Sequence, residues 1–264
     1  MKYSQYLKLG ISFLALSGCI ASIVCLQKDS LSKIETVRDE NTYKKEQEAF
    51  ASAAKIRKKI PSFGFNNLIA DLTFLKFIQY FGDGEARQAT GYSTVTDYFE
   101  DIVSRDPNFI QSHLVFSAAN SLFAARPKKT VDLIDKTLEK VNPQAPNYPF
   151  LLWTYKAADE TLFLGDLKAA KHSYEMAARW ARQYRYDVDI SQEMAGRYDK
   201  TVKYLASNPD PTQAQFGAWM SILYSTKDSK TQNYILNRLK DLGAEIEITP
   251  NGKLNIKPPE FERA

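Results

Sequence analysis

Apolar positions in the middle of the chain recur with the 3.6-residue period of an α-helix, most clearly between residues 162 and 181. There a Gly-Asp turn leads into a segment whose small, large and small side chains follow at i, i+4 and i+7, on one helix face. Small residues let a second helix approach closely, and the large one fills the space between turns. The pattern predicts the turn and second helix of a packed helical hairpin. Its packing residues are Gly165, Ala170, Tyr174 and Ala177.

Two earlier segments show the same spacing, and each ends just before a proline. They consist of Val95, Phe99 and Ile102 before Asp106-Pro107, and of Val131, Asp135 and Leu138 before Asn142-Pro143. Partner helices are predicted at Phe109–Ala125 and Tyr148–Leu164, and the first of these has Val115, Ala118, Ala119 and Leu122 on one side. The equivalent positions Val95, Val131 and Ala170 lie 36 and 39 residues apart, close to the ~34-residue period of tetratricopeptide repeats. Three such hairpins are enough for a small α-solenoid.

The segment Asn66–Asp83 has apolar residues around its whole circumference instead of along one stripe. Such a distribution predicts a central helix that other elements cover on most sides. Asp71 and Lys76 are five residues apart and point in different directions, so they do not pair with each other. A buried carboxylate at Asp71 could mark a functional site, but we expect it to form a hydrogen bond with a neighbouring turn instead.

Before and after these hairpins the pattern is weaker. A stalk helix is predicted over Lys28–Ile60, ended by Pro61. Later helices are expected at Ser191–Ala206, Thr212–Ser225 and Lys230–Leu242, followed by a β-hairpin around Asn251-Gly252 that packs on the last helix. The predicted organisation is an anchor (1–27), a stalk (28–60), a repeat domain (61–186) and C-terminal capping helices with the hairpin (187–264).

The anchor is an uncharged run of eighteen residues, Leu9–Leu26, which just reaches the length of a single transmembrane helix. It continues too far for the apolar core of a cleaved secretory signal. The segment Leu16–Cys19 also matches the bacterial lipoprotein cleavage pattern, in which Cys19 is lipidated, although the residues after it stay apolar. Basic residues are nearly balanced on the two sides of the run. We place the rest of the chain after the anchor, called the body, on the non-cytoplasmic side.

Three stretches together resemble a group of membrane-anchored tetratricopeptide-like proteins of bacteria and cyanobacteria. They are ADLTFLKFIQYFGD at 70–83, DP at 106–107 and LGDLKAA at 164–170, behind an N-terminal apolar anchor. The resemblance covers roughly residues 61–181. It implies a helical-repeat fold, a plasma or thylakoid membrane location, and a role in assembling or maintaining a membrane complex of the photosynthetic type. The chain departs from the family pattern at Thr161, Leu122, Arg126 and Arg182, which puts a regular binding groove in doubt.

The composition argues against several kinds of ligand and catalytic site. The net charge of +4 is small and the charges are interspersed, which argues against nucleic-acid binding. Both cysteines lie in the anchor, so the body offers no Cys ligand or nucleophile. His113 and His172 fall on different repeats, so neither has a partner for catalysis or metal binding. Asp187 and Asp189 lie close together, but their stretch offers too few oxygen ligands to bind a cation. We expect no catalytic residue, no metal, no cofactor and no small-molecule substrate.

Aromatic and basic side chains alternate near the end of the repeat region, a composition typical of a protein-binding surface. The candidate partner-binding residues are Arg179, Trp180, Arg182, Arg185 and Tyr186. The alternative is that Trp180 and Tyr184, four residues apart, pack inward and leave only solvated arginines. The loop Gly84–Ser93 and the terminal hairpin are the next places to look for a binding site.

The sequence therefore favours a non-catalytic, membrane-tethered protein-interaction module. Its partners would be other proteins of a membrane complex. The alternatives are a permanent structural subunit of such a complex and a cell-envelope lipoprotein.

Overall fold

The computed structural model describes residues 16–25, 27, 39–57, 61–226, 228–248 and 254–260. The chain divides into two compact units, Met1–Tyr43 and Lys44–Ala264. Residues 16–25 are helical, while the rest of the predicted anchor and the first part of the predicted stalk fall outside the described residues. Across the part that is described, no helix combines the length and the apolar character needed to cross a membrane.

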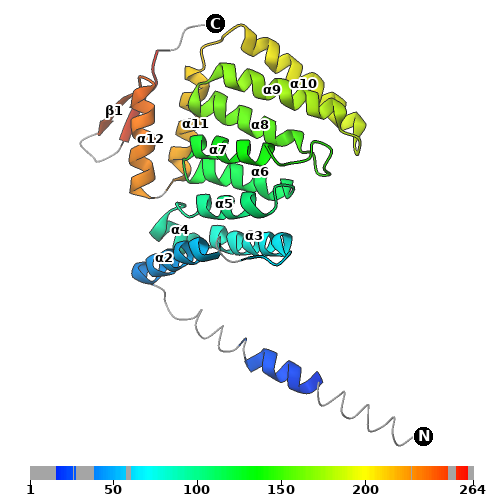
Figure 1. The fold of residues 1–264 in the computed structure, drawn as a ribbon. Helices are drawn as coiled ribbons and strands as arrows, with labels where there is room; N and C mark the ends of the chain where they lie inside the picture. Colours follow the sequence, from blue (N-terminus) through cyan, green and yellow to red (C-terminus); the bar gives the residue numbers. More distant parts are fainter. Residues whose placement is uncertain are drawn as a thin grey trace, which may run out of the picture. The chain divides into compact units, whose positions relative to one another are not determined.

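The second unit is built of helices with one small two-stranded sheet, so the all-helical class with a C-terminal hairpin is confirmed (Figure 1). The helix α2 extends from the first unit into the second. The elements are α2 (Glu40–Arg57), α3 (Asn66–Gly82), α4 (Gly84–Thr90), α5 (Val95–Arg105), α6 (Ile110–Ala118), η1 (Ala119–Phe123), α7 (Pro127–Leu138), α8 (Phe150–Asp159), η2 (Glu160–Leu164), α9 (Leu167–Gln183), α10 (Val188–Ala206), α11 (Thr212–Ser225), α12 (Ser229–Asp241), β1 (Glu245–Ile248) and β2 (Leu254–Lys257).

Helices α3 and α5 to α10 pack side by side in a stack, consistent with a helical solenoid (Figure 1). A continuous cluster of aromatic and aliphatic side chains fills the stack from α3 to α10. The three predicted core residues of α5, Val95, Phe99 and Ile102, are all fully buried. Their i, i+4, i+7 spacing therefore identified the inward face of this helix correctly.

The predicted hairpin turn and second helix are η2–α9. Gly165 ends η2 with φ of +67°, a left-handed conformation that glycine adopts without strain. The Asp166 carboxylate then accepts a 2.9 Å hydrogen bond from the Ala169 backbone N–H at the start of α9. Ala170 and Ala177 are fully buried in a helix that packs against both α8 and α10, as their small size predicts. Tyr174 is half-buried, with its ring 6.0 Å from that of Tyr198 on α10.

For α6 with η1, and for α7, the helices were predicted but their packing faces only in part. Ala119 is buried and Leu138 packs against the core cluster. Val115 and Leu122 are 41% and 42% exposed. The buried residues of α7 are Pro127, Thr130, Leu133, Ile134 and Thr137, not Val131 and Asp135. Threonine is polar, but inside a helix its hydroxyl can donate to the carbonyl of the preceding turn, as Thr137 does to Leu133 at 3.0 Å. A count of apolar residues therefore misplaced the face by about one position.

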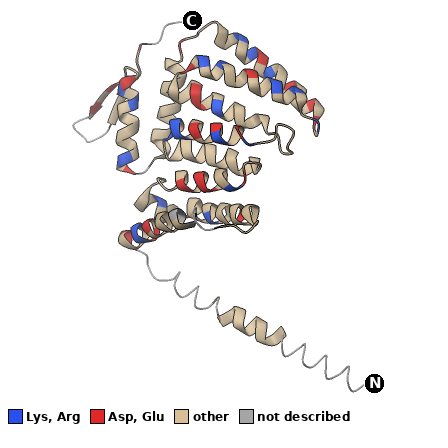
Figure 2. Cartoon of the chain, in the orientation of Figure 1, with Lys and Arg blue, Asp and Glu red and all other residues tan. Residues whose placement is uncertain are grey.

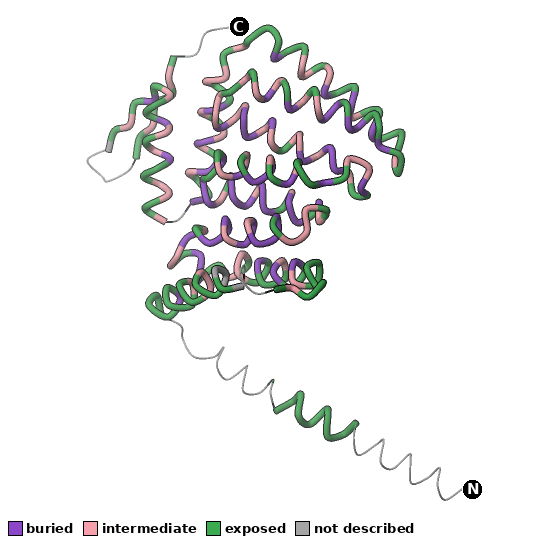
Figure 3. The backbone as a smooth tube through the Cα atoms, viewed as in Figure 1, coloured by how far each residue is buried: buried purple, intermediate pink, exposed green. Residues whose placement is uncertain are grey.

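The predicted central helix matches α3 in its bounds, but not in its burial. Leu68, Leu72 and Leu75 are 53%, 50% and 60% exposed (Figure 3), and Asp71 is exposed too. Only the side formed by Ala70, Thr73 and Phe77 is buried, against α5 and α6. The prediction failed because α3 is the end helix of the stack. It was made from composition, which does not reveal where a helix lies.

The part of α2 that belongs to the second unit packs against α5 and the turn that precedes it. Phe50 stacks on Tyr98 of α5 with ring centroids 4.0 Å apart. The Gln47 side-chain amide donates to the hydroxyls of Ser93 and Thr94, at 2.9 and 2.6 Å. The segment after α3, which was predicted to be a loop, contains the short helix α4. The Asp83 side chain caps it by accepting from the Ala86 backbone N–H.

After α10 the chain turns back beside the stack. Helix α11 packs against η1 and η2, and α12 packs on α11 (Figure 1). A second apolar cluster holds these helices together and consists of Ala125, Phe163, Trp219, Ile222, Ile235, Leu239 and Ala244. The antiparallel hairpin pairs Ile246 with Ile256, and both pack against this cluster. The predicted contact between the hairpin and the last helix is therefore confirmed.

Candidate functional site: a basic pocket beside the helix turns

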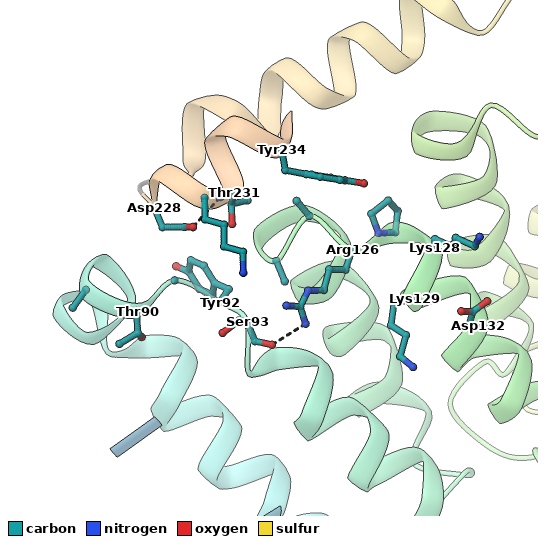
Figure 4. Close-up of a pocket in the computed structure, with 16 residues that line it drawn as sticks. Thr90, Tyr92, Ser93, Arg126, Lys128, Lys129, Asp132, Asp228, Thr231 and Tyr234 are labelled. Atoms are coloured by element: carbon teal, nitrogen blue, oxygen red, sulfur yellow. Dashed lines mark hydrogen bonds between the residues drawn. The ribbon is translucent and has the colours of Figure 1, made fainter. Parts of the chain in front are cut away.

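A pocket of about 740 Å³ lies where three separate segments meet: the α4–α5 turn, the η1–α7 turn and the start of α12 (Figure 4). Basic and aromatic side chains dominate its polar lining. The basic residues of the lining are Arg126, Lys128, Lys129 and Lys230, and its aromatic residues are Tyr92 and Tyr234. We call this site the turn pocket.

Each wall of the turn pocket is fixed by local interactions. The buried Arg87 donates from Nη1 to the Gly91 carbonyl at 2.6 Å, which holds the α4–α5 turn. Gly91 has φ of +66°, and a Cβ at this position would come within 3.1 Å of the Asp228 carboxyl group. Asp228 itself caps α12 by accepting from the Thr231 backbone N–H at 2.9 Å. The close approach of turn and helix thus requires a residue without a side chain.

Arg126 joins the second wall to the first. Its Nη1 donates to the Ser93 carbonyl at 3.0 Å, drawn in Figure 4, and to the Thr96 hydroxyl at 2.9 Å. Both acceptors are neutral, so the guanidinium charge is not cancelled where it borders the pocket. The interaction ties the start of α7 to the start of α5.

The turn pocket has a local excess of positive charge, although both signs are spread over the helices of the second unit as a whole (Figure 2). Four basic residues line it against two acidic ones, Asp132 and Asp228. Lys129 pairs with Glu100 at 2.8 Å, and the hydrogen bond that its ammonium donates to this carboxylate raises the pKa of Lys129. Lys128 and Lys230 are exposed, and among the described residues neither makes an ion pair. These two ammonium groups are available to a ligand.

Two tyrosines supply flat apolar surface beside these charges. Burial raises the pKa of Tyr92, so its hydroxyl stays protonated at neutral pH and can donate a hydrogen bond. Tyr234 is 46% exposed, and its ring lies 5.9 Å from that of Trp219 in the second apolar cluster. A ring supported from behind offers contact area with little loss of side-chain entropy on binding.

Behind Arg126 a chain of buried hydrogen bonds runs into the stack. Asn120 on η1 accepts from Thr96 at 2.7 Å and donates to Thr130 at 2.9 Å. Ser121 donates to the Asp159 carboxylate at 2.6 Å. Burial raises the pKa of Asp159 from 3.8 to about 7. Since Asp159 is only 6% exposed, this chain holds the turns in place and does not face a ligand.

The structure only partly assembles the partner-binding surface predicted around Arg179. Trp180 is buried, with its ring 5.9 Å from that of Trp153, and Tyr184 is 3% exposed. Arg182 pairs with Asp199 of α10. Arg179 and Arg185 are exposed, as is Tyr186 at 67%. The two aromatic residues four apart thus pack inward, and the outward surface retains one tyrosine and two arginines that form no ion pair with another described residue.

The remaining candidate groups lie apart from one another. His113 is buried on α6, where desolvation lowers its pKa to about 4, and its Nε2 lies 3.0 Å from the Asp106 carbonyl. His172 is exposed on α9. Asp187 caps α10 and accepts from the Tyr148 hydroxyl at 3.0 Å. Cys19 is exposed in the helical segment 16–25 of the first unit. In the described segments, no three His, Cys, Asp or Glu side chains gather as metal ligands would.

No protein-family model, curated protein or solved structure matches this chain. The turn pocket was missed because its lining comes from residues 89–93, 124–132 and 228–234, which the sequence keeps far apart. One signal did point there, since the loop Gly84–Ser93 was the second choice for a binding site. No pattern in the sequence indicated that this loop lies beside the start of α12.

Proposed function

We propose that this protein is a non-catalytic interaction module, tethered to a membrane by residues 9–26, that holds an acidic segment of a partner protein in the turn pocket. The observation that carries the proposal is the pair of unengaged lysines, Lys128 and Lys230, beside two tyrosines in one concave site. Positive charge selects acidic ligands, and tyrosine contributes most of its binding energy through buried area.

The shape of the site favours a peptide over a compact small molecule. The turn pocket is lined by two turns, α4–α5 and η1–α7, and by the start of α12, so an extended segment can contact all three at once. Its lysines come from two different elements, α7 and α12. An acidic segment that reaches both would bridge the stack and the C-terminal helices.

Two finer features belong to the same proposal. We assign the stack to the tetratricopeptide-like solenoids, because the Gly165 turn and the buried alanines of α9 reproduce that packing in its clearest repeat. The resemblance to membrane-anchored tetratricopeptide-like proteins of bacteria and cyanobacteria points to a partner in a plasma- or thylakoid-membrane complex, which this protein helps to assemble or maintain. A weak contact is sufficient there, because tethering raises the local concentration of the module.

The test is a direct binding measurement on the full-length chain in detergent micelles. A fluorescent ten-residue peptide of Glu, Leu and Tyr serves as the probe, and its binding is read by fluorescence polarisation. The variant Lys128→Glu with Lys230→Glu should weaken binding by about tenfold or more. The matched control, Arg179→Glu with Arg185→Glu, makes the same charge change at two exposed positions, one on α9 and one just after it, outside the turn pocket, and should bind as the wild type does.

The outcomes separate the two candidate surfaces. If only the arginine variant loses the peptide, the partner binds at the predicted Arg179–Tyr186 surface and the turn pocket is not the site. If both variants bind equally well, neither surface recognises acidic segments. Crosslinking of each variant in native membranes then asks whether the same two lysines are needed to recover the physiological partner.

A further inference from the structure

The outer side of α3 carries a row of apolar residues that are each at least half exposed. The exposed fractions are 61% for Phe65, just before the helix, 53% for Leu68, 50% for Leu72 and 60% for Leu75. The intervals between these residues are three, four and three. The residues that face the body, Ala70, Thr73 and Phe77, lie on the opposite side of the helix. We call this exposed row the α3 seam.

Alternating intervals of three and four are the a and d positions of a heptad, the repeat that brings two helices together in a coiled coil. With Phe65 and Leu72 at a, and Leu68 and Leu75 at d, Asp71 occupies position g and Lys76 position e. Both charged residues are exposed. They flank the α3 seam on opposite edges, which explains why they cannot pair within one chain.

We propose that the α3 seam joins two copies of this chain, with their α3 helices parallel and in register. In a parallel pair the g edge of one helix borders the e edge of the other, and the residue at g faces the residue five positions later at e of the partner. Asp71 of each copy then meets Lys76 of the other. The seam is thereby complementary to itself in both shape and charge, as a two-fold interface requires.

Other occupants fit the same observations less well. In an antiparallel pair, edges of the same kind meet, so Asp71 borders the Asp71 edge of the second helix and the two ion pairs do not form. A lipid surface would attract basic flanks, whereas this row has the acidic Asp71 on the edge where Ile78 is also exposed. A second parallel copy satisfies both charged residues.

The size of the seam sets the expected strength. Its next a and d positions are Gln79 and Gly82, so the apolar contact at a and d is limited to four residues in two heptads, with Ile78, 47% exposed, beside them at position g. Such a contact falls below the roughly 1,000 Å² of a stable interface. The dimer is therefore weak and concentration-dependent in solution. Attachment to a membrane, which rests on the proposed function, would strengthen it, but the pairing itself does not depend on the tether.

Disulfide trapping tests the arrangement in the full-length chain in micelles. Cys19 and Cys25 are first replaced by Ser, and then Leu68→Cys, Leu72→Cys and Leu75→Cys are made singly. In a parallel, in-register pair each of these residues faces its own copy, so mild oxidation should give a covalent dimer in all three variants. Tyr204→Cys, an equally exposed position on α10, is the control and should stay monomeric.

The pattern of crosslinks distinguishes the occupants. A dimer at only one of the three positions indicates an antiparallel pair and overturns the proposal. No dimer at any position overturns it as well, and in that case the seam is covered by lipid, by another protein or by the N-terminal segment of the same chain. Circular dichroism on each variant confirms that the exposed substitutions leave the helices intact.

Charge exchange tests the predicted ion pairs. In the Leu75→Cys background, Asp71→Lys places two lysines on each edge of the seam, and Lys76→Asp places two aspartates there. Each should reduce the rate of crosslinking by about threefold to tenfold. The double variant Asp71→Lys with Lys76→Asp restores opposite charges and should recover the original rate. If the double variant crosslinks as slowly as the single ones, Asp71 does not face Lys76 of a second copy.

Discussion

Helices α9 and α3 are both seventeen residues long, yet the less apolar of the two is the better buried. The small residues of α9 lie between α8 and α10, and Ala170, Ala177 and Ala181 have no exposed surface. In α3, three leucines are at least half exposed because the helix has a stack on one side only. Burial is thus set by the position of a helix in the stack. Apolar content shows what a helix can bury, but not what covers it.

The largest effect should come from the inner side of α3. Phe77 is fully buried and its ring lies 4.1 Å from that of Phe116. Phe77→Ala should lower the free energy of unfolding by about 3–5 kcal/mol, while Leu75→Ala on the outer side should change it by less than about 0.5 kcal/mol. Urea unfolding of both variants at low protein concentration measures the difference. Equal effects would mean that the outer side is covered.

Two aspartates extend the comparison to charge. Asp71 at the open end of the stack was predicted to be buried and is exposed, whereas Asp159 in the interior was not singled out and is buried. Between pH ~4 and 7 the folded state retains a proton on Asp159 that the unfolded state has released, because burial raises the pKa from 3.8 to about 7. The stability that Asp159 contributes at low pH is therefore lost as the pH rises through this window.

Asp159→Asn should remove that loss, since an amide does not titrate and its oxygen can still accept from Ser121. Relative to wild type, the variant should gain stability from pH 4 to 8, by as much as about 4 kcal/mol for a shift of this size. Asp71→Asn makes the same change of side chain at an exposed position and serves as the control. The comparison of denaturant midpoints between variants also cancels the opposite effect of His113, whose lowered pKa makes the folded state less stable as the pH falls. A flat difference curve for Asp159→Asn would contradict its assignment.

Overpacking tests the closeness of the contacts around α9. Ala177 is fully buried, with α8 and α10 packed on the helix, and Ala177→Leu should destabilise the protein by about 1–3 kcal/mol. Arg179→Leu, two residues later on the exposed side, should change stability by less than about 0.5 kcal/mol. Thermal unfolding followed by circular dichroism compares the two variants. A melting temperature for Ala177→Leu equal to that of wild type would remove the repeat assignment where it is best supported.

The same contrast shows how much the sequence could predict. Local signals were sufficient for α5, whose three spaced core residues are buried, for α11, whose bounds were predicted correctly, and for the terminal hairpin. They failed where polar side chains are buried and where the helical period changes. The inward face of α7 depends on buried threonines that bond to their own helix, and the π-helical turns η1 and η2 break the period used to read the pattern.

The candidate site was the least predictable part of the molecule. Arg179 and Arg185 were correctly placed on the surface, but Trp180 is buried because Trp153, on another helix, covers it. The turn pocket requires α12 to return beside the stack and its capping residue Asp228 to approach Gly91. Neither event leaves a local signature, since both depend on how α11 packs against η1 and η2.

The smallest effect on the folded monomer should come from the α3 seam itself. Leu72 is half exposed, so Leu72→Gln should leave the free energy of unfolding within about 0.5 kcal/mol of wild type at low concentration.

The effect of Leu72→Gln on stability should appear only as the protein concentration rises. Association of folded chains stabilises the folded state by mass action, so the melting temperature of the wild type should increase with protein concentration. Leu72→Gln should abolish that increase, and Tyr204→Gln on α10 should preserve it. If the wild-type melting temperature does not depend on concentration up to the millimolar range, the open end of the stack does not pair with itself, and the contrast between α3 and α9 reflects a missing partner of another kind.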